Sequence, residues 1–231
     1  MKKIVSLLAL VVAFSSCQED LQTNNTAFQA KQNDVYWRAN DARVSIDEDG
    51  KMVITAYSQF ETVTLETAST DPGIYVLGTT NQENFATYSN DVDGFSDYYD
   101  TGLYSGPAFK VSAMINRGTA YQANSAGAQT TGGSGSGLRV ATQTTNGTVT
   151  AITVVARGVG YRPGDIVTIV GGNNNATFRV INIQQSNGEI EIEEVENGLF
   201  TGKYKFNAVN EEGQVITFSE CVFYKIPLST F

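Results

Sequence analysis

Apolar and polar residues alternate along most of the chain with the two-residue period of β-strands that have one dry and one wet face. The segments 44–46 and 52–56 flank a turn sequence at 47–50. Farther along, 189–193 alternates isoleucine with glutamate, and 215–226 is the longest predicted strand. The sequence shows no convincing helical period. The pattern therefore predicts an all-β fold, either an antiparallel β-sandwich or a barrel-like domain.

The segment 109–185 differs from the rest because it is rich in glycine, threonine, asparagine and alanine and contains an internal repeat. Its two copies, at about 109–147 and 149–187, match at an offset of 40 residues. The matching pairs are Arg117 and Arg157, Gly118 and Gly158, Tyr121 and Tyr161, Gly132 and Gly172, Leu138 and Phe178, Arg139 and Arg179, and Val140 and Val180. A fixed period indicates one supersecondary unit used twice. We expect the copies to share a core, because one copy cannot bury enough apolar surface alone.

Residues 1–16 have the three parts of a secretory signal. Lys2 and Lys3 precede an uncharged apolar run at 4–14, and Ser15 and Ser16 are the small residues beside the cleavage site. The apolar run is too short to cross a bilayer as a helix, since that takes about 20 residues. With the cysteine at position 17, the segment resembles the lipobox of bacterial lipoproteins, although Phe14 stands where the common pattern has leucine. The resemblance implies cleavage before Cys17 and lipidation of its thiol. The alternative is a secreted protein whose first mature residue is a cysteine.

In this interpretation, residues 17–27 are the lipidated cysteine and a polar tether. Gln18, Glu19 and Asp20 resemble the export signal that carries Bacteroidetes lipoproteins to the outer face of the outer membrane. This resemblance implies an outer-membrane protein that is anchored by lipid and faces the cell exterior. The periplasmic face of the same membrane is the alternative location.

Composition removes several classes of function. The chain has no histidine, which excludes Ser-His-Asp and Cys-His catalysis and most transition-metal sites. Without Lys2 and Lys3, the mature chain has 13 basic and 24 acidic residues, a formal charge of −11 that argues against binding of nucleic acid. Besides Cys17 there is one cysteine, Cys221, which lies in an apolar run and is expected to be a buried, inert thiol.

The outer segments resemble the family of Bacteroidetes lipoproteins defined by a domain of unknown function, DUF6252. The resemblance rests on FQAKQNDVYWRA at 28–39, GKMVITA at 50–56, PGIYVLG at 72–78 and the C-terminal hairpin at 198–228, where Cys221 replaces an expected glycine. It implies a β domain with a lipid anchor and no reaction.

The repeat segment resembles the G-x-G-Y-x-x-G-D modules of phage tail fibres and other virion proteins, which also occur in bacterial surface proteins. The second copy carries this pattern at Gly158, Gly160, Tyr161, Gly164 and Asp165. The first copy departs from it, since Ala120 replaces the second glycine. The resemblance implies an all-β module for spacing, display or attachment. We therefore expect a discontinuous β domain, 28–108 plus 186–231, with the module 109–185 inserted at an exposed loop.

The densest acidic cluster lies in a predicted loop at 90–100. Its carboxylates could bind Ca²⁺, which takes about six to eight oxygen ligands, although their order does not fit an EF-hand. The candidate ligands are Asp91, Asp93, Asp97 and Asp100. The alternative is a solvated loop, and no other cofactor is expected.

Aromatic residues make the same stretch a candidate ligand or partner surface. They are Phe95, Tyr98, Tyr99 and Tyr104. Rings beside carboxylates can stack on sugars or anchor a protein partner. The alternative is that the rings fold under the repeat segment and fill the junction with the β domain.

Together these features predict a non-catalytic, lipid-anchored outer-membrane protein that acts as an accessory or partner-binding subunit of an envelope complex. A glycan-binding or adhesive surface module is the alternative. A remote third hypothesis is a glycoside hydrolase, which would need two paired carboxylates in the absence of histidine. The glutamates considered for such a pair are Glu61, Glu66, Glu189 and Glu191.

Overall fold

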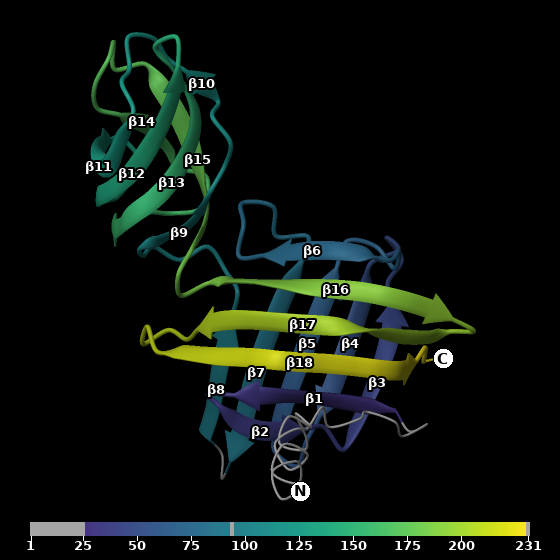
Figure 1. Cartoon of the computed structure of the whole chain (residues 1–231). Coiled ribbons are helices and arrows are strands. Elements are labelled where there is room, and N and C mark those ends of the chain that lie inside the picture. The colour runs from purple at the N-terminus through teal and green to yellow at the C-terminus, as the bar shows by residue number, and fades with distance from the viewer. Residues whose placement is uncertain (1–25, 93–94, 230–231) are drawn as a thin grey trace, which may run out of the picture.

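The computed structural model describes residues 26–92 and 95–229, and it shows two antiparallel β-sheets (Figure 1). The predicted all-β fold is confirmed, because every regular element in these ranges is a strand. Within the same ranges, no helix has the length and apolar character needed to cross a membrane. The predicted signal peptide, Cys17 and most of the tether lie outside the described residues.

Eleven strands of the described chain form a sheet that curls into a half-barrel, which we call the base. They are β1 (Ala27–Gln32), β2 (Val35–Arg38), β3 (Asp41–Ile46), β4 (Met52–Tyr57), β5 (Glu61–Thr67), β6 (Gly73–Leu77), β7 (Phe85–Val92), β8 (Phe95–Asp100), β16 (Asn187–Glu196), β17 (Leu199–Val209) and β18 (Val215–Pro227). Their order is β2-β1-β18-β17-β8-β7-β5-β4-β3, and β16 and β6 continue outward from β17. The sheet folds over where β17 meets β8, so that β6, β16, β17, β18 and β1 cross the layer of β3, β4, β5 and β7 (Figure 1).

The core of the base fills the space between these two layers. Alternation along each strand sends one set of side chains inward, for example Ile54 and Leu65 from one layer and Phe206 and Phe218 from the other. The rings of Phe206 and Phe218 stack with centroids 4.7 Å apart. Cys221 is buried as predicted, and burial raises the pKa of its thiol, which keeps it protonated.

Strand β18 reaches across the base because two bulges bend it. The pairing with β17 shifts by one residue beside Glu220 and again beside Lys225. Both residues have positive φ, 49° and 51°, which is unusual outside glycine and asparagine. A bulge adds bend and twist to its strand, so these two positions help the sheet to curl.

Seven strands of residues 108–183 form a second, nearly closed barrel, which we call the head. They are β9 (Ala108–Val111), β10 (Asn116–Arg117), β11 (Asn124–Thr131), β12 (Ser136–Thr145), β13 (Thr148–Val159), β14 (Ile166–Ile169) and β15 (Ala176–Ile183). The order is β10-β15-β14-β11-β12-β13, and β9 also pairs with β15. Because β9 and β10 come close to β13, the sheet almost closes on itself.

The 40-residue repeat is visible in the architecture of the head. Strands β11 and β14 follow the matched tyrosines, Tyr121 and Tyr161, and they pair with each other, Thr130 opposite Ile169. Both tyrosines are buried in one core, to which each copy contributes matched residues such as Leu138 and Phe178. The two copies thus bury each other's apolar side chains.

The G-D pair of the second copy links the copies at one end of the head. The Asp165 carboxylate accepts hydrogen bonds from the hydroxyl and backbone N–H of Ser134, at 2.7 and 3.0 Å, and from the backbone N–H of Arg162 at 2.9 Å. Burial opposes ionisation of Asp165, but these hydrogen bonds outweigh it and lower the pKa of the carboxyl. The motif that resembled virion modules therefore has a structural role here, because it fixes the glycine-rich turn of the first copy.

Two short segments, 101–107 and 184–186, connect the head to the base (Figure 1). They run beside each other, since the Gln184 N–H donates to the Pro107 carbonyl at 2.9 Å and the Ser186 hydroxyl donates to the Gly102 carbonyl at 2.6 Å. The methyl group of Thr80, from the base, lies against Gly164 of the head. The head is therefore held at one end of the base by several contacts.

Candidate functional site

The prediction of an acidic loop at 90–100 is wrong, because 85–92 and 95–100 form the paired strands β7 and β8. Strand β7 pairs with β5 on one side and with β8 on the other, where Asn90 is opposite Asp97, and this pairing imposes the strand conformation. Alternation then places Asp91 and Asp97 on opposite faces of the hairpin. Asp91 and Asp100 share a face but are four strand positions apart, about 13 Å. Asp93 lies outside the described residues, among which no group of three carboxylates, cysteines or histidines could hold a metal ion.

The hairpin does not gather its aromatic residues into one platform. Tyr99 packs on the core side, with its ring 5.9 Å from that of Tyr88, whereas Tyr98 points outward and is 51% exposed. The Tyr104 hydroxyl donates to the Asp100 carboxylate at 2.9 Å, and burial together with this hydrogen bond raises the pKa of Tyr104. The side chain of Phe95 lies outside the part of the chain that the structure describes. Tyr98 alone of the three described tyrosines is free to meet a ligand.

Of the four glutamates considered as a catalytic pair, Glu189 and Glu191 share a face, and the other two point elsewhere. Glu61 faces the interior of the base, where it meets Trp37 and Tyr88. Glu66, on the same strand, faces outward and pairs with Lys51 at 3.1 Å. Glu189 and Glu191 lie on the outer side of β16, whose inward positions are isoleucines. The structure therefore brings none of the other three close to Glu61.

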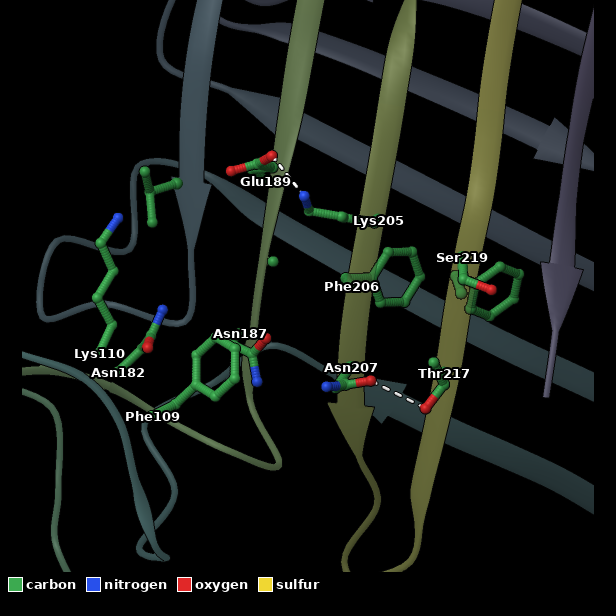
Figure 2. A pocket seen from close by; sticks show the side chains of 13 residues that line it. Phe109, Lys110, Asn182, Asn187, Glu189, Lys205, Phe206, Asn207, Thr217 and Ser219 are labelled. Carbon is green, nitrogen blue, oxygen red and sulfur yellow. Dashed lines mark hydrogen bonds and ion pairs between the residues drawn. The ribbon is translucent and has the colours of Figure 1, made fainter. Parts of the chain in front are cut away.

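A hollow that we call the cleft lies between head and base (Figure 2). It has a volume of about 330 Å³, within the range of about 300–1,000 Å³ typical of small-molecule sites. Strands β16, β17 and β18 supply one side, and β9 and β15 supply the other. The main lining residues are Phe109, Lys110, Asn182, Asn187, Gly188, Glu189, Lys205, Asn207, Thr217 and Ser219.

The base side of the cleft is polar and fixed by side-chain pairs. Lys205 and Glu189 form an ion pair at 2.8 Å, and the Thr217 hydroxyl donates to the side-chain carbonyl oxygen of Asn207 at 2.9 Å. Between them Gly188, with φ 157°, lies so close to β17 that a Cβ there would overlap the Lys205 carbonyl oxygen. Glycine at this position therefore permits the close approach of β16 to β17 between these two pairs of hydrogen-bonding groups.

The head side of the cleft combines an aromatic ring with unpaired polar groups. Figure 2 shows Phe109, Lys110 and Asn182 together on this side. Phe109 is 42% exposed, and the Arg157 guanidinium lies 4.7 Å from its ring centroid. Asn182 is only 2% exposed, yet its side-chain carbonyl oxygen has no hydrogen-bond partner. Leaving a buried acceptor unpaired costs about 1–3 kcal/mol, so a hydrogen bond to this oxygen from a water molecule or a ligand would be stabilising.

Asn187 holds the chain at the crossing from head to base. Its side-chain amide donates to the backbone carbonyls of Ile183, at 3.0 Å, and Gln184. The sequence analysis missed this region, because Phe109 and Asn182 are 73 positions apart and come together only through the pairing of β9 with β15. The available signal was Asn182, a polar residue at a position where the alternation of Ala176, Phe178 and Val180 predicts an apolar one.

The arrangement defines a class of protein: an all-β protein with a half-barrel, a nearly closed barrel, and a polar and aromatic cleft between them. The family model described as a domain of unknown function, DUF6252, matches residues 24–116 and 105–227. Because these matches cover most of the chain, the protein belongs to the DUF6252 family. No curated protein and no solved structure matches the chain.

Proposed function

We propose that the protein is a non-catalytic, lipid-anchored surface protein of the outer membrane that binds a glycan in the cleft. The observation that carries the proposal is the buried, unpaired carbonyl oxygen of Asn182 beside an exposed aromatic ring. A sugar hydroxyl supplies the missing donor, and the apolar face of a sugar suits the Phe109 ring. The ion pair and the Thr217–Asn207 pair offer further donors and acceptors to the remaining hydroxyls.

The anchor completes the proposal. We infer that Cys17 is lipidated as in Bacteroidetes lipoproteins and that residues 18–26 form the tether, which spans at most about 30 Å when extended. Figure 1 supports display of the head, since β1 begins on the side of the base away from it. In this arrangement the head is an inserted module that is held away from the membrane, with the cleft open to the exterior.

A panel of cell-surface and dietary glycans tests the binding proposal with the full-length protein in mild detergent. We expect at least one oligosaccharide to bind with an affinity that Asn182→Leu reduces at least tenfold, since the lost hydrogen bond is to a buried group. Asn90→Leu is the matched control, because Asn90 also has a buried, unpaired carbonyl oxygen, but on the β7–β8 hairpin. A panel on which nothing binds would sink the proposal.

A second candidate function is that of a partner-binding subunit in an envelope complex. The observation in its favour is the open edge strand β2, on which Val35 is 69% and Tyr36 60% exposed. An exposed edge can accept a strand from another protein. Affinity purification from native membranes tests this, and a stoichiometric partner released by Val35→Lys would support it. Purification of the protein alone would refute it.

A further inference from the structure

Charge is divided unequally between the two barrels. The head, residues 108–183, contains six basic residues and one acidic residue, a formal charge of +5. The rest of the sequence from residue 26 onward, 26–107 and 184–231, contains 7 basic and 21 acidic residues, a formal charge of −14. The negative charge of the whole chain therefore conceals a basic head on an acidic base.

The basic side chains of the head are exposed and have no carboxylate partners. None of the five ion pairs in the described ranges involves a residue of the head. The basic residues are Lys110, Arg117, Arg139, Arg157, Arg162 and Arg179. The one acidic residue, Asp165, is already held by Ser134 and the backbone of Arg162. The positive charge of the head is thus not neutralised internally.

Four of these side chains lie on neighbouring strands that lead to the cleft, and we call them the basic belt: Lys110, Arg139, Arg157 and Arg179. Arg157 on β13 is paired with Leu138, whereas the neighbouring Arg139 on β12 lies on the other face of this strand pair, where its guanidinium donates to the Gly127 carbonyl at 2.9 and 3.2 Å. The Arg157 guanidinium covers the ring of Phe109 on β9, and Lys110 follows on the same strand. Arg179 lies on β15, where its backbone carbonyl accepts from the Ser112 N–H just after β9. The belt therefore ends at Lys110, inside the cleft.

We infer that the ligand is an acidic glycan, whose carboxylate or sulfate groups contact the belt while a neighbouring sugar occupies the cleft. This inference rests on the proposed function. Guanidinium groups bind carboxylate and sulfate through paired hydrogen bonds, and an unpaired basic surface attracts anionic chains over the screening length of the solution.

The head lacks what a nucleic acid would require beyond positive charge. Single-stranded nucleic acids bind through aromatic rings on which bases stack. Of the aromatic residues of the head, Tyr121, Tyr161 and Phe178 are buried in its core, which leaves the single exposed ring of Phe109 and no row of rings for successive bases. The surface therefore suits a chain of sugars with anionic groups better than one with bases.

Biosensor titration of the full-length protein in non-ionic detergent tests the inference. The probes are heparin and polygalacturonate as acidic glycans, dextran and laminarin as neutral ones, and single-stranded DNA. We expect an acidic glycan to bind at least tenfold more tightly than the neutral ones in 50 mM salt and to lose most of that advantage in 500 mM salt. Arg139→Gln with Arg157→Gln should weaken acidic-glycan binding roughly 25-fold, since each basic residue near an anionic surface contributes a factor of roughly five.

The matched control is Arg38→Gln with Arg43→Gln, which removes two exposed arginines from the base. Its affinity for the acidic glycan should stay within about twofold of the wild type. Equal binding of neutral and acidic glycans would overturn this inference and leave the proposed function standing. Equal binding of DNA would overturn the assignment to a glycan, and absence of all glycan binding would overturn both proposals.

Discussion

Replacement of Glu61 by alanine should destabilise the base strongly. The Glu61 carboxylate accepts hydrogen bonds from the Trp37 indole N–H at 2.7 Å, the Tyr88 hydroxyl at 2.7 Å and the Ser58 hydroxyl at 2.8 Å. Trp37 and Tyr88 are buried, so Glu61→Ala leaves two buried donors unpaired. Each costs about 1–3 kcal/mol, and partial access of water to the site reduces the sum, which gives about 3 kcal/mol. At about 2–4 °C per kcal/mol, the base should melt roughly 6–12 °C lower.

The assay follows the fluorescence of Trp37, which is the sole tryptophan of the chain and reports on the base alone. Glu66→Ala is the matched control, since Glu66 lies on the same strand but is paired at the surface with Lys51. Surface pairs contribute about 0–1 kcal/mol, so its melting temperature should change little. Equal shifts in the two variants would refute the reasoning.

The same site predicts an acid dependence of stability. Burial opposes ionisation of Glu61, but the hydrogen bonds from Tyr88, Ser58 and Trp37 outweigh it, and the pKa is lowered on folding. A lowered folded-state pKa means that this stabilisation is complete above the unfolded value, about 4.3, and is lost as pH falls through the folded value. The stability difference between wild type and Glu61→Gln should therefore shrink in the same range. A difference that grows as pH falls would contradict the assignment.

Two further predictions concern the anchor and the bulged strand. Cys17→Ser should abolish incorporation of radiolabelled fatty acid and release the protein from membranes. Cys221→Ser should leave acylation intact, because Cys221 is buried. Continued acylation of Cys17→Ser would refute the anchor. Lys225→Gly should raise the free energy of unfolding by up to about 1 kcal/mol, since φ 51° is strained for a residue with a Cβ. Urea unfolding measures this change, and a loss of stability would show that the bulge is not strained.

Much of the fold could be predicted from the sequence, because strand alternation is a local property. The isoleucine–glutamate alternation of 189–193 appears as the inward and outward faces of β16, and the predicted strand 215–226 is confirmed as β18. The repeat also indicated how the head would bury its core. The hairpin β7–β8 was missed because Asp91 and Asp97 are poor strand formers, and pairing with β5 overrides that local preference.

The candidate site was beyond prediction, since it depends on contacts between distant segments. Asn182 looks like an ordinary strand residue until the structure shows that it is buried without a hydrogen-bond donor. Phe109 and Lys205 reach the same cleft from different barrels. The net charge of the whole chain also obscured the basic head, because the head and the base carry opposite net charges that partly cancel in the sum.

Calorimetric titration of the Asn182→Leu variant tests the central claim most directly, with the best-binding glycan of the panel as ligand. Removing an acceptor that is unpaired in the free protein should leave the melting temperature unchanged or raise it, while glycan affinity falls at least tenfold. The Asn90→Leu control should bind as the wild type does. Unchanged glycan affinity in Asn182→Leu would contradict the account, because the cleft would then not be where the glycan binds.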